Sequence, residues 1–173
     1  MDFFPPLTLW DTKSLHESSA NWLALHLRVM EEKPIFNIEL EAPNMVMRFL
    51  WFRTFHQPVV IRAEINQEGM SVLHTKITDG NGAYRAGKLI YSERNKLSAA
   101  QISTINTYLI EMDYWNMEPF TPEIWLDGAE WIVEIRTGDT YKLVKRTSPR
   151  TGFYRELGLY LLEIANVTVE NIY

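Results

Sequence analysis

The glutamates and histidines of this sequence could carry acid–base or metal chemistry, but their spacing favours neither. Glu130 and Glu134 share one face of a predicted strand, where four residues span about 13 Å. Retaining glycosidases hold their carboxyl groups ~5 Å apart, and inverting enzymes also need less than this separation. We expect cross-strand salt bridges with Lys142 or Lys145 instead. No two histidines have the spacing that brings two imidazoles to one metal ion: they are His16, His26, His56 and His74.

The sequence also lacks the familiar catalytic and cofactor-binding motifs. It has no cysteine, which excludes disulfides, thiolate metal sites and cysteine nucleophiles. No G-x-S-x-G, Walker or G-x-G-x-x-G motif occurs. Residues 79–82, Asp-Gly-Asn-Gly, lack the alternating carboxylates and distal glutamate of a calcium loop, so they predict a hairpin turn. We therefore expect a protein that is not an enzyme and has no metal and no cofactor.

An acidic and aromatic stretch is the most distinctive feature of the chain. Residues 111–135 hold seven carboxylates, five large aromatic side chains and no lysine or arginine, whereas residues 136–155 hold six basic residues and one acid. Clustered carboxylates destabilise a compact fold unless cations offset them. Either the basic segment does so, or a basic partner protein does, with Trp115 or Phe120 as a buried anchor. The predicted partner-binding residues are Asp113, Trp115, Glu118, Phe120, Glu123, Trp125, Asp127 and Glu130.

Length and composition limit the possible folds and the possible kinds of partner. The 173 residues, with 46% hydrophobic content, predict a single domain over residues 1–173, with residues 1–12 as an N-terminal arm. The first residues do not form a secretory signal, and no apolar run approaches the ~20 residues of a membrane span. The net charge of −5 argues against nucleic acid as the partner. We expect a cytoplasmic protein with no membrane partner.

The hydrophobic pattern predicts an α+β fold. Strands are expected at residues 46–55, 59–65, 70–78 and 83–91, followed by a meander at residues 124–146 with turns at Asp127-Gly128 and Gly138-Asp139. In the meander, Trp131, Val133 and Ile135 should share one face. Together the segments indicate an antiparallel sheet or meander with about three helices packed on it.

Three helices are expected, with different degrees of local support. A capping box of Ser98 and Gln101 predicts the start of the second, with Ile102, Ile105, Leu109 and Met112 as its apolar stripe. Residues 14–32 fit a helix with Trp22, Leu25, His26, Val29 and Met30 on one face, although alternating leucines leave a strand open. Ser148 before Pro149 predicts the start of the third helix, with Phe153, Leu157, Tyr160, Leu161 and Ile164 on its buried face.

Three segments carry a resemblance to known sequences. They are Arg48-Phe49-Leu50-Trp51-Phe52-Arg53-Thr54-Phe55-His56, then Asp127-Gly128-x-x-Trp131-x-x-Glu134, and Tyr141-x-x-Val144-x-Arg146-x-Ser148-Pro149. Over roughly residues 46–165 the chain resembles a group of uncharacterised bacterial proteins that have these motifs. Thr147 stands where the group has tryptophan. The resemblance implies a shared fold and no particular chemistry.

These observations favour a non-enzymatic cytoplasmic protein-binding module with an acidic aromatic surface. An immunity or inhibitor protein that neutralises a basic toxin or enzyme is one concrete form of this hypothesis. A small-ligand binder or hydrolase with a pocket around His56, Arg48, Arg53 and Glu134 is a second interpretation. A homodimeric structural protein is a third.

Overall fold

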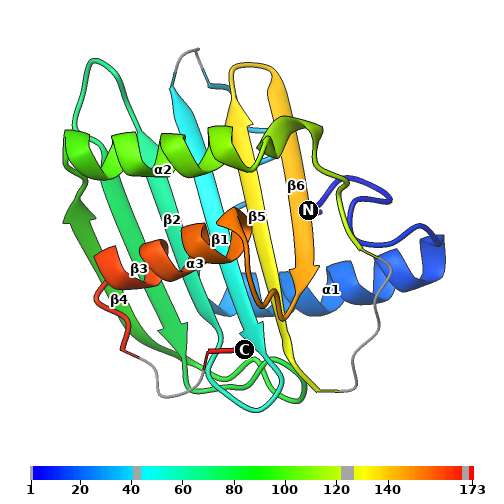
Figure 1. Cartoon of the computed structure of the whole chain (residues 1–173). Coiled ribbons are helices and arrows are strands. Elements are labelled where there is room, and N and C mark those ends of the chain that lie inside the picture. The colour runs from blue at the N-terminus through cyan, green and yellow to red at the C-terminus, as the bar shows by residue number, and fades with distance from the viewer. Residues whose placement is uncertain (1, 41–43, 122–126, 169–171) are drawn as a thin grey trace.

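The computed structural model describes residues 2–40, 44–121, 127–168 and 172–173. One antiparallel sheet of six strands, in the order β4-β3-β2-β1-β5-β6, forms the centre of the molecule. Helices α2 and α3 cover one face and α1 covers the other (Figure 1), which confirms the α+β prediction. The strands are β1 Met45–Arg53, β2 Val59–Ile65, β3 Val72–Thr78, β4 Leu89–Lys96, β5 Ala129–Thr137 and β6 Thr140–Thr147; the helices are α1 Lys13–Val29, α2 Ala99–Glu111, α3 Phe153–Ile164 and the short 3-10 helix η1 Tyr114–Asn116.

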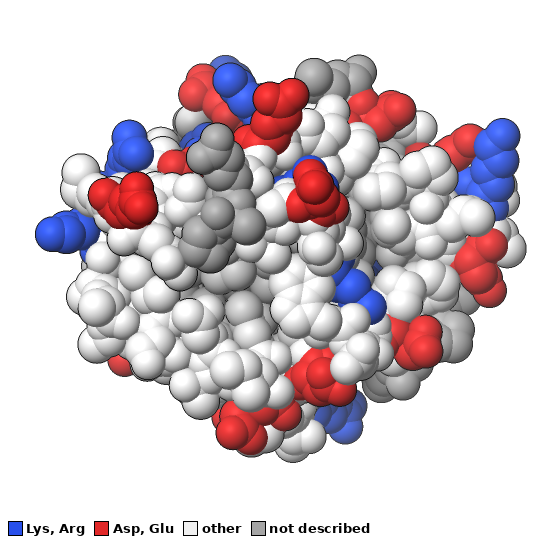
Figure 2. Space-filling model, turned by 90° about the horizontal axis from the view of Figure 1, so that it is seen from above, with Lys and Arg blue, Asp and Glu red and all other residues white. Residues whose placement is uncertain are grey.

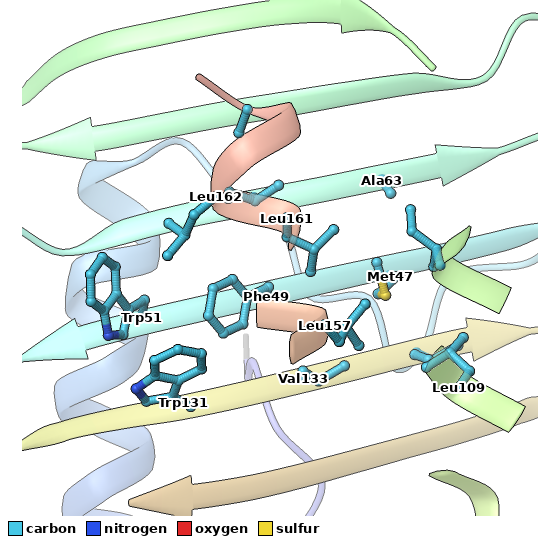
Figure 3. Packing of buried hydrophobic residues seen from close by; sticks show 14 of the residues in the cluster. Met47, Phe49, Trp51, Ala63, Leu109, Trp131, Val133, Leu157, Leu161 and Leu162 are labelled. Atoms are coloured by element: carbon cyan, nitrogen blue, oxygen red, sulfur yellow. The ribbon is translucent and has the colours of Figure 1, made fainter. Parts of the chain in front are cut away.

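The central strand β1 contributes to a hydrophobic core on each side of the sheet. Met47, Phe49 and Trp51 are buried beneath α2 and α3, together with side chains from β5 and from α3. Figure 3 shows these side chains meeting Trp131 and Val133 of β5 between the sheet and α3. Leu50 and Phe52 alternate to the other face and pack beneath α1. Because helices cover both faces, β1 is apolar almost without interruption.

Gly158 of α3 makes the close approach of this helix to the sheet possible. A Cβ atom at this position would lie 2.2 Å from Cζ3 of Trp131 and 3.1 Å from Cζ of Phe49. Only glycine leaves room for the two rings at this distance from the helix backbone. The small residue therefore fixes how closely α3 packs on β1 and β5.

The first two helices follow the local sequence signals. Residues 13–29 are helical, which excludes the strand alternative. The predicted face of α1 is partly wrong, because Leu25 is exposed while Leu23 and Leu27 are buried. The capping box of Ser98 and Gln101 begins α2 as predicted. Its predicted stripe is confirmed, since Ile105 and Leu109 are buried and Ile102 and Met112 pack partly buried against the same core.

The start predicted for the third helix is wrong. Ser148 donates its backbone N–H to the carbonyl oxygen of Ala129 and accepts the Ala129 N–H on its hydroxyl oxygen. These contacts extend the β5–β6 pairing, so α3 begins only after Gly152. The predicted buried face is partly confirmed, since Leu157 and Leu161 are buried, but Tyr154 is buried in place of the exposed Phe153.

Most strand predictions agree with the structure to within two residues. Gly138-Asp139 closes the β5–β6 hairpin as predicted, with Thr137 paired to Thr140. The exception is β4, which begins at Leu89 and not at residue 83. The backbone N–H of Gly82 donates to the carbonyl oxygen of Arg53, and residues 79–88 form a long connection against the end of β1. Within this connection, Asn81 and Arg85 pair as an antiparallel bridge around a short turn, so the turn lies slightly later than predicted. The strand expected before Asp127 lies outside the described residues.

The N-terminal segment, predicted as an arm, lies against the α1 face. Phe3, Phe4 and Leu9 are buried in the core beneath α1. The indole N–H of Trp10 donates to the hydroxyl oxygen of Ser19 in α1. Residues 2–10 therefore add apolar contacts to the smaller of the two cores.

Candidate partner-binding surface

A buried tyrosine positions the short helix η1 that follows α2. The Tyr114 side chain is fully buried, with its hydroxyl oxygen 3.0 Å from the carbonyl oxygens of Val133 in β5 and Lys142 in β6. Burial raises the pKa of Tyr114 well above its ordinary value, so the hydroxyl keeps its proton and donates. One side chain thus holds the turn against two strands of the sheet.

Trp115 is the exposed neighbour of this anchor. Its indole is 40% exposed and meets the Tyr114 ring edge-on, with the ring centroids 5.5 Å apart. An indole held on a pinned turn loses little conformational freedom when a partner covers it. Tryptophan is also the residue type most enriched among those that dominate binding energy at protein interfaces.

Three exposed carboxylates flank Trp115: Glu111, Asp113 and Glu118. Within the described part of the chain, none of them takes part in an ion pair. Trp115 and these three acids form the surface that we call the η1 surface. A side chain such as Trp115 with a charged rim has the arrangement of an interface anchor.

One member of the η1 surface, Glu111, is locally unfavourable for the fold. Glu111 is the last residue of α2, and the last turn of this helix contains no basic residue. A negative charge there opposes the helix dipole. Asp113 has a left-handed backbone with φ of 51°, which aspartate tolerates better than most residues, and its carboxylate accepts the side-chain amide of Asn116. Departures from local rules such as that of Glu111 concentrate at functional sites.

The segment after η1 covers the outer edge of β6. The backbone N–H of Lys145 donates to the carbonyl oxygen of Pro119 at 2.6 Å, and Phe120 bridges to Lys145 in parallel. Phe120 is half-buried and packs near Trp10, with 6.3 Å between ring centroids. Phe120 therefore closes a sheet edge and contributes less surface than Trp115.

The remaining predicted residues do not gather around Trp115. Glu130 projects to the α1 face of the sheet, where its carboxylate lies 3.5 Å from the Lys145 ammonium. Glu130 thus makes the cross-strand pair expected from the sequence, whereas Glu134 pairs with Arg48 and not with a lysine of β6. Asp127 is exposed just before β5 and lines a different cavity, together with His56. Glu123 and Trp125 lie outside the described residues. Trp131 is fully buried, as a core tryptophan is.

A buried ionic network lies between the sheet and the segment after α1. Arg48 of β1 donates from Nε and Nη2 to Oε2 of Glu134 at 2.8 and 2.6 Å, and the Tyr141 hydroxyl donates to Oε1 at 2.7 Å. Glu32 lies 3.6 Å from Arg48 and 2.9 Å from Lys76. The side chains of Arg48, Glu134 and Glu32 are fully buried.

The network balances its own charges. Burial raises the pKa of Glu134, whereas Arg48 and the Tyr141 hydroxyl oppose that rise. Burial acts to lower the pKa of Arg48, but Glu134 and Glu32 outweigh it and hold that pKa above its ordinary value. Sequence reasoning placed Arg48 in the alternative ligand pocket. The missed signal was the regular alternation that places Arg48 on the α1 face.

The four residues of the alternative pocket do not converge. Arg48 and Glu134 lie on the α1 face and are saturated by each other. Arg53 lies on the opposite face, with its guanidinium 4.1 Å from the centroid of the Trp51 ring. His56 follows β1 on that side and contacts Tyr173. Only Arg53 and His56 remain near one another, so the pocket as predicted is wrong.

The view from above shows no single acidic field. Acidic and basic side chains are scattered there among uncharged atoms (Figure 2). This face therefore offers no broad acidic surface to a basic partner. Among the described residues, no group of three or more His, Asp or Glu side chains could hold a metal ion, and no described helix is long and apolar enough to span a bilayer.

Comparisons of the chain with protein-family models and with curated proteins find no match. Of the predicted partner-binding residues, Asp113, Trp115 and Glu118 belong to the η1 surface, to which the exposed Glu111 is added.

Proposed function

We propose that this protein is a non-enzymatic, cytoplasmic protein-binding module that engages a basic partner through the η1 surface. The observation that carries the proposal is Trp115, exposed on a turn that the buried Tyr114 pins to the sheet. The partner's basic groups would meet the carboxylates around the indole. An immunity or inhibitor protein that blocks a basic toxin or enzyme is a concrete form of this function.

The energetics of the turn support the proposal. Glu111 opposes the dipole of α2, and Asp113 holds a left-handed backbone. The Glu111 charge does not stabilise the isolated chain. A cationic partner near the turn would offset the Glu111 charge that opposes the helix dipole and would pair with the Asp113 carboxylate.

A capture experiment with matched variants tests the proposal. The immobilised protein is exposed to a lysate of its native host, and retained proteins are compared between wild type, Trp115→Ala, Glu118→Lys and Glu163→Lys. Glu163 is an exposed acid of α3 and serves as a charge-matched control. We expect one basic protein that wild type and Glu163→Lys retain and that the two η1 variants lose.

Kinetics with the purified partner test the electrostatic part separately. Steering between opposite charges predicts association that slows steeply as ionic strength rises. An association rate that is the same at 20 and at about 300 mM salt would contradict the mechanism. Retention of the same partners by all four proteins would contradict the η1 surface itself.

A further inference from the structure

A cavity of about 330 Å³ opens on the α1 face of the sheet. Phe52 of β1, Glu130 of β5 and Thr147 of β6 line it together, because they lie directly opposite one another on neighbouring strands. Trp22 of α1 and Trp10 of the N-terminal segment line it as well. Segments from five parts of the chain therefore meet at this cavity.

The two indoles of the cavity are held in place through their N–H groups. Trp10 donates to the hydroxyl oxygen of Ser19 at 2.8 Å, and Trp22 donates to the carbonyl oxygen of Gly82 at 2.6 Å. Because indole has no other hydrogen-bonding group, the polar requirement of both rings is met within the protein. A ligand in the cavity consequently meets preformed aromatic walls, as is usual for small-molecule sites.

Glu130 is the only charged residue that lines the cavity in the described part of the chain. Its side chain is 33% exposed, and the Lys145 ammonium lies 3.5 Å from its Oε1. Lys145 does not line the cavity: its side chain is only 2% exposed, and its ammonium lies 3.7 Å from the centroid of the Trp10 ring. Oε2 of Glu130 makes no hydrogen bond with the described residues. One carboxylate oxygen is thus left without a donor.

Thr147 supplies a second acceptor beside this oxygen. It is half-buried and lies directly opposite Glu130 in the β5–β6 pair, an arrangement that places the two Cβ atoms about 5 Å apart. Its hydroxyl makes no hydrogen bond with the described residues. A carboxylate oxygen and a hydroxyl oxygen are therefore within reach of one group with several N–H donors. An ammonium has three such donors and no acceptor.

The lining favours a cation over an anion or a neutral molecule. Glu130 repels an anion, and no described cation lines the cavity to offset that repulsion. Aromatic rings attract cations, and the contact between Lys145 and Trp10 is an example within this protein. A hydrogen bond to a carboxylate also contributes more when the donor is charged. The Lys145 ammonium opposes a second cation near Glu130, so its removal should strengthen binding.

We propose that this cavity binds a small organic ammonium ion with an aromatic body, of the arylalkylamine class. The ammonium donates to Oε2 of Glu130 and to the hydroxyl oxygen of Thr147. The ring of the ligand packs against Trp10, Trp22 and Phe52, where offset or edge-on contacts between rings are favourable. No residue of the η1 surface lines the cavity, so this site does not depend on the proposed protein partner.

Calorimetric titration with 2-phenylethylammonium tests the site, and 2-phenylethanol is the neutral probe of the same size. We expect saturable binding of the ammonium to wild type and binding of the alcohol that is at least about tenfold weaker. Glu130→Gln should bind the ammonium about tenfold more weakly than wild type does, with an unchanged affinity for the alcohol. Glu163→Gln, which removes an exposed acid of α3, should behave as wild type.

The site assignment is overturned if wild type shows no saturable binding up to about 10 mM ammonium, or if it binds the alcohol as tightly. Both results are measured on wild type and need no variant. Equal affinity of wild type and Glu130→Gln for the ammonium overturns the role of the carboxylate. If Glu130→Gln does not fold, Lys145→Met replaces it and should bind the ammonium about threefold more tightly than wild type. An unchanged or weaker affinity of Lys145→Met then overturns the same role.

Discussion

Replacing Arg48 by methionine should be among the most destabilising single changes in this protein. The substitution keeps an apolar stem of similar length but removes the guanidinium. Glu134 then loses both of its arginine hydrogen bonds and retains only the Tyr141 hydroxyl. Glu32 loses one of its three basic neighbours and retains Arg62 and Lys76.

The magnitude follows from the burial of the partner left behind. Removing one member of a buried, hydrogen-bonded ion pair typically costs 3–5 kcal/mol, whereas replacing both members by apolar groups is often neutral. We therefore expect Arg48→Met to lose about 4 kcal/mol of unfolding free energy from a total on the order of 5–15 kcal/mol. Glu134→Leu should cost less, because Arg48 keeps Glu32 and the carbonyl oxygen of Lys33.

Urea unfolding of wild type, both single variants and the double variant measures the coupling. Arg48→Met/Glu134→Leu should be more stable than Arg48→Met alone, with a coupling free energy of at least about 2 kcal/mol. The comparison requires that the slope of unfolding free energy against urea concentration is the same in all four proteins. A cost below about 1 kcal/mol for Arg48→Met, or strictly additive single costs, would refute the account of the buried network.

Three further changes test other parts of the structure. His26 is fully buried between Trp22 and Phe52, and burial lowers its pKa from 6.5 to about 4. Between these two pH values only the unfolded state gains the proton, so protonation favours unfolding. In urea unfolding, the unfolding free energy of wild type should therefore fall by about 3 kcal/mol more than that of His26→Leu between pH 7 and pH 4. Gly158→Ala should lower the unfolding free energy by about 1–3 kcal/mol, because the added methyl group overlaps the Trp131 ring. An unchanged midpoint of thermal unfolding would contradict this, because it would mean that α3 can move away from the ring at no cost. Glu111→Lys should raise the unfolding free energy by about 0.3–1 kcal/mol, because a positive charge at the end of α2 suits the helix dipole, and it should abolish partner binding. If the variant is more stable but still binds the partner, Glu111 takes no part in binding.

Local sequence signals were sufficient for most of the secondary structure. The Ser98 and Gln101 capping box, the Gly138-Asp139 turn and the alternation along β5 depend on residues that are close in the chain, so their geometry follows from short-range sterics and hydrogen bonding. The same reasoning failed at Ser148. Its favourable position before a proline was overridden by pairing with Ala129, which lies 19 residues away.

The candidate site was only partly accessible to sequence reasoning. The stretch of acids and aromatic residues predicts Trp115 and its neighbours as partner-binding residues, and the structure shows Trp115 exposed. It did not distinguish the exposed Glu118 from Glu134, which the fold buries. The sequence shows which residues are charged, but the fold of the sheet determines which carboxylates lie beside a cation.

The sequence by itself determined the α+β class, the main helix and strand segments and the exclusion of cysteine chemistry. The tertiary structure alone decided which charges are neutralised and which side chains share a cavity. Arg48 and Glu134 are 86 residues apart and Trp51 and Tyr173 are 122 apart. These contacts depend on the register between β1 and β5 and on the path of the chain around the sheet. Because a shift of one residue would reverse the faces of a strand, no local pattern could specify them.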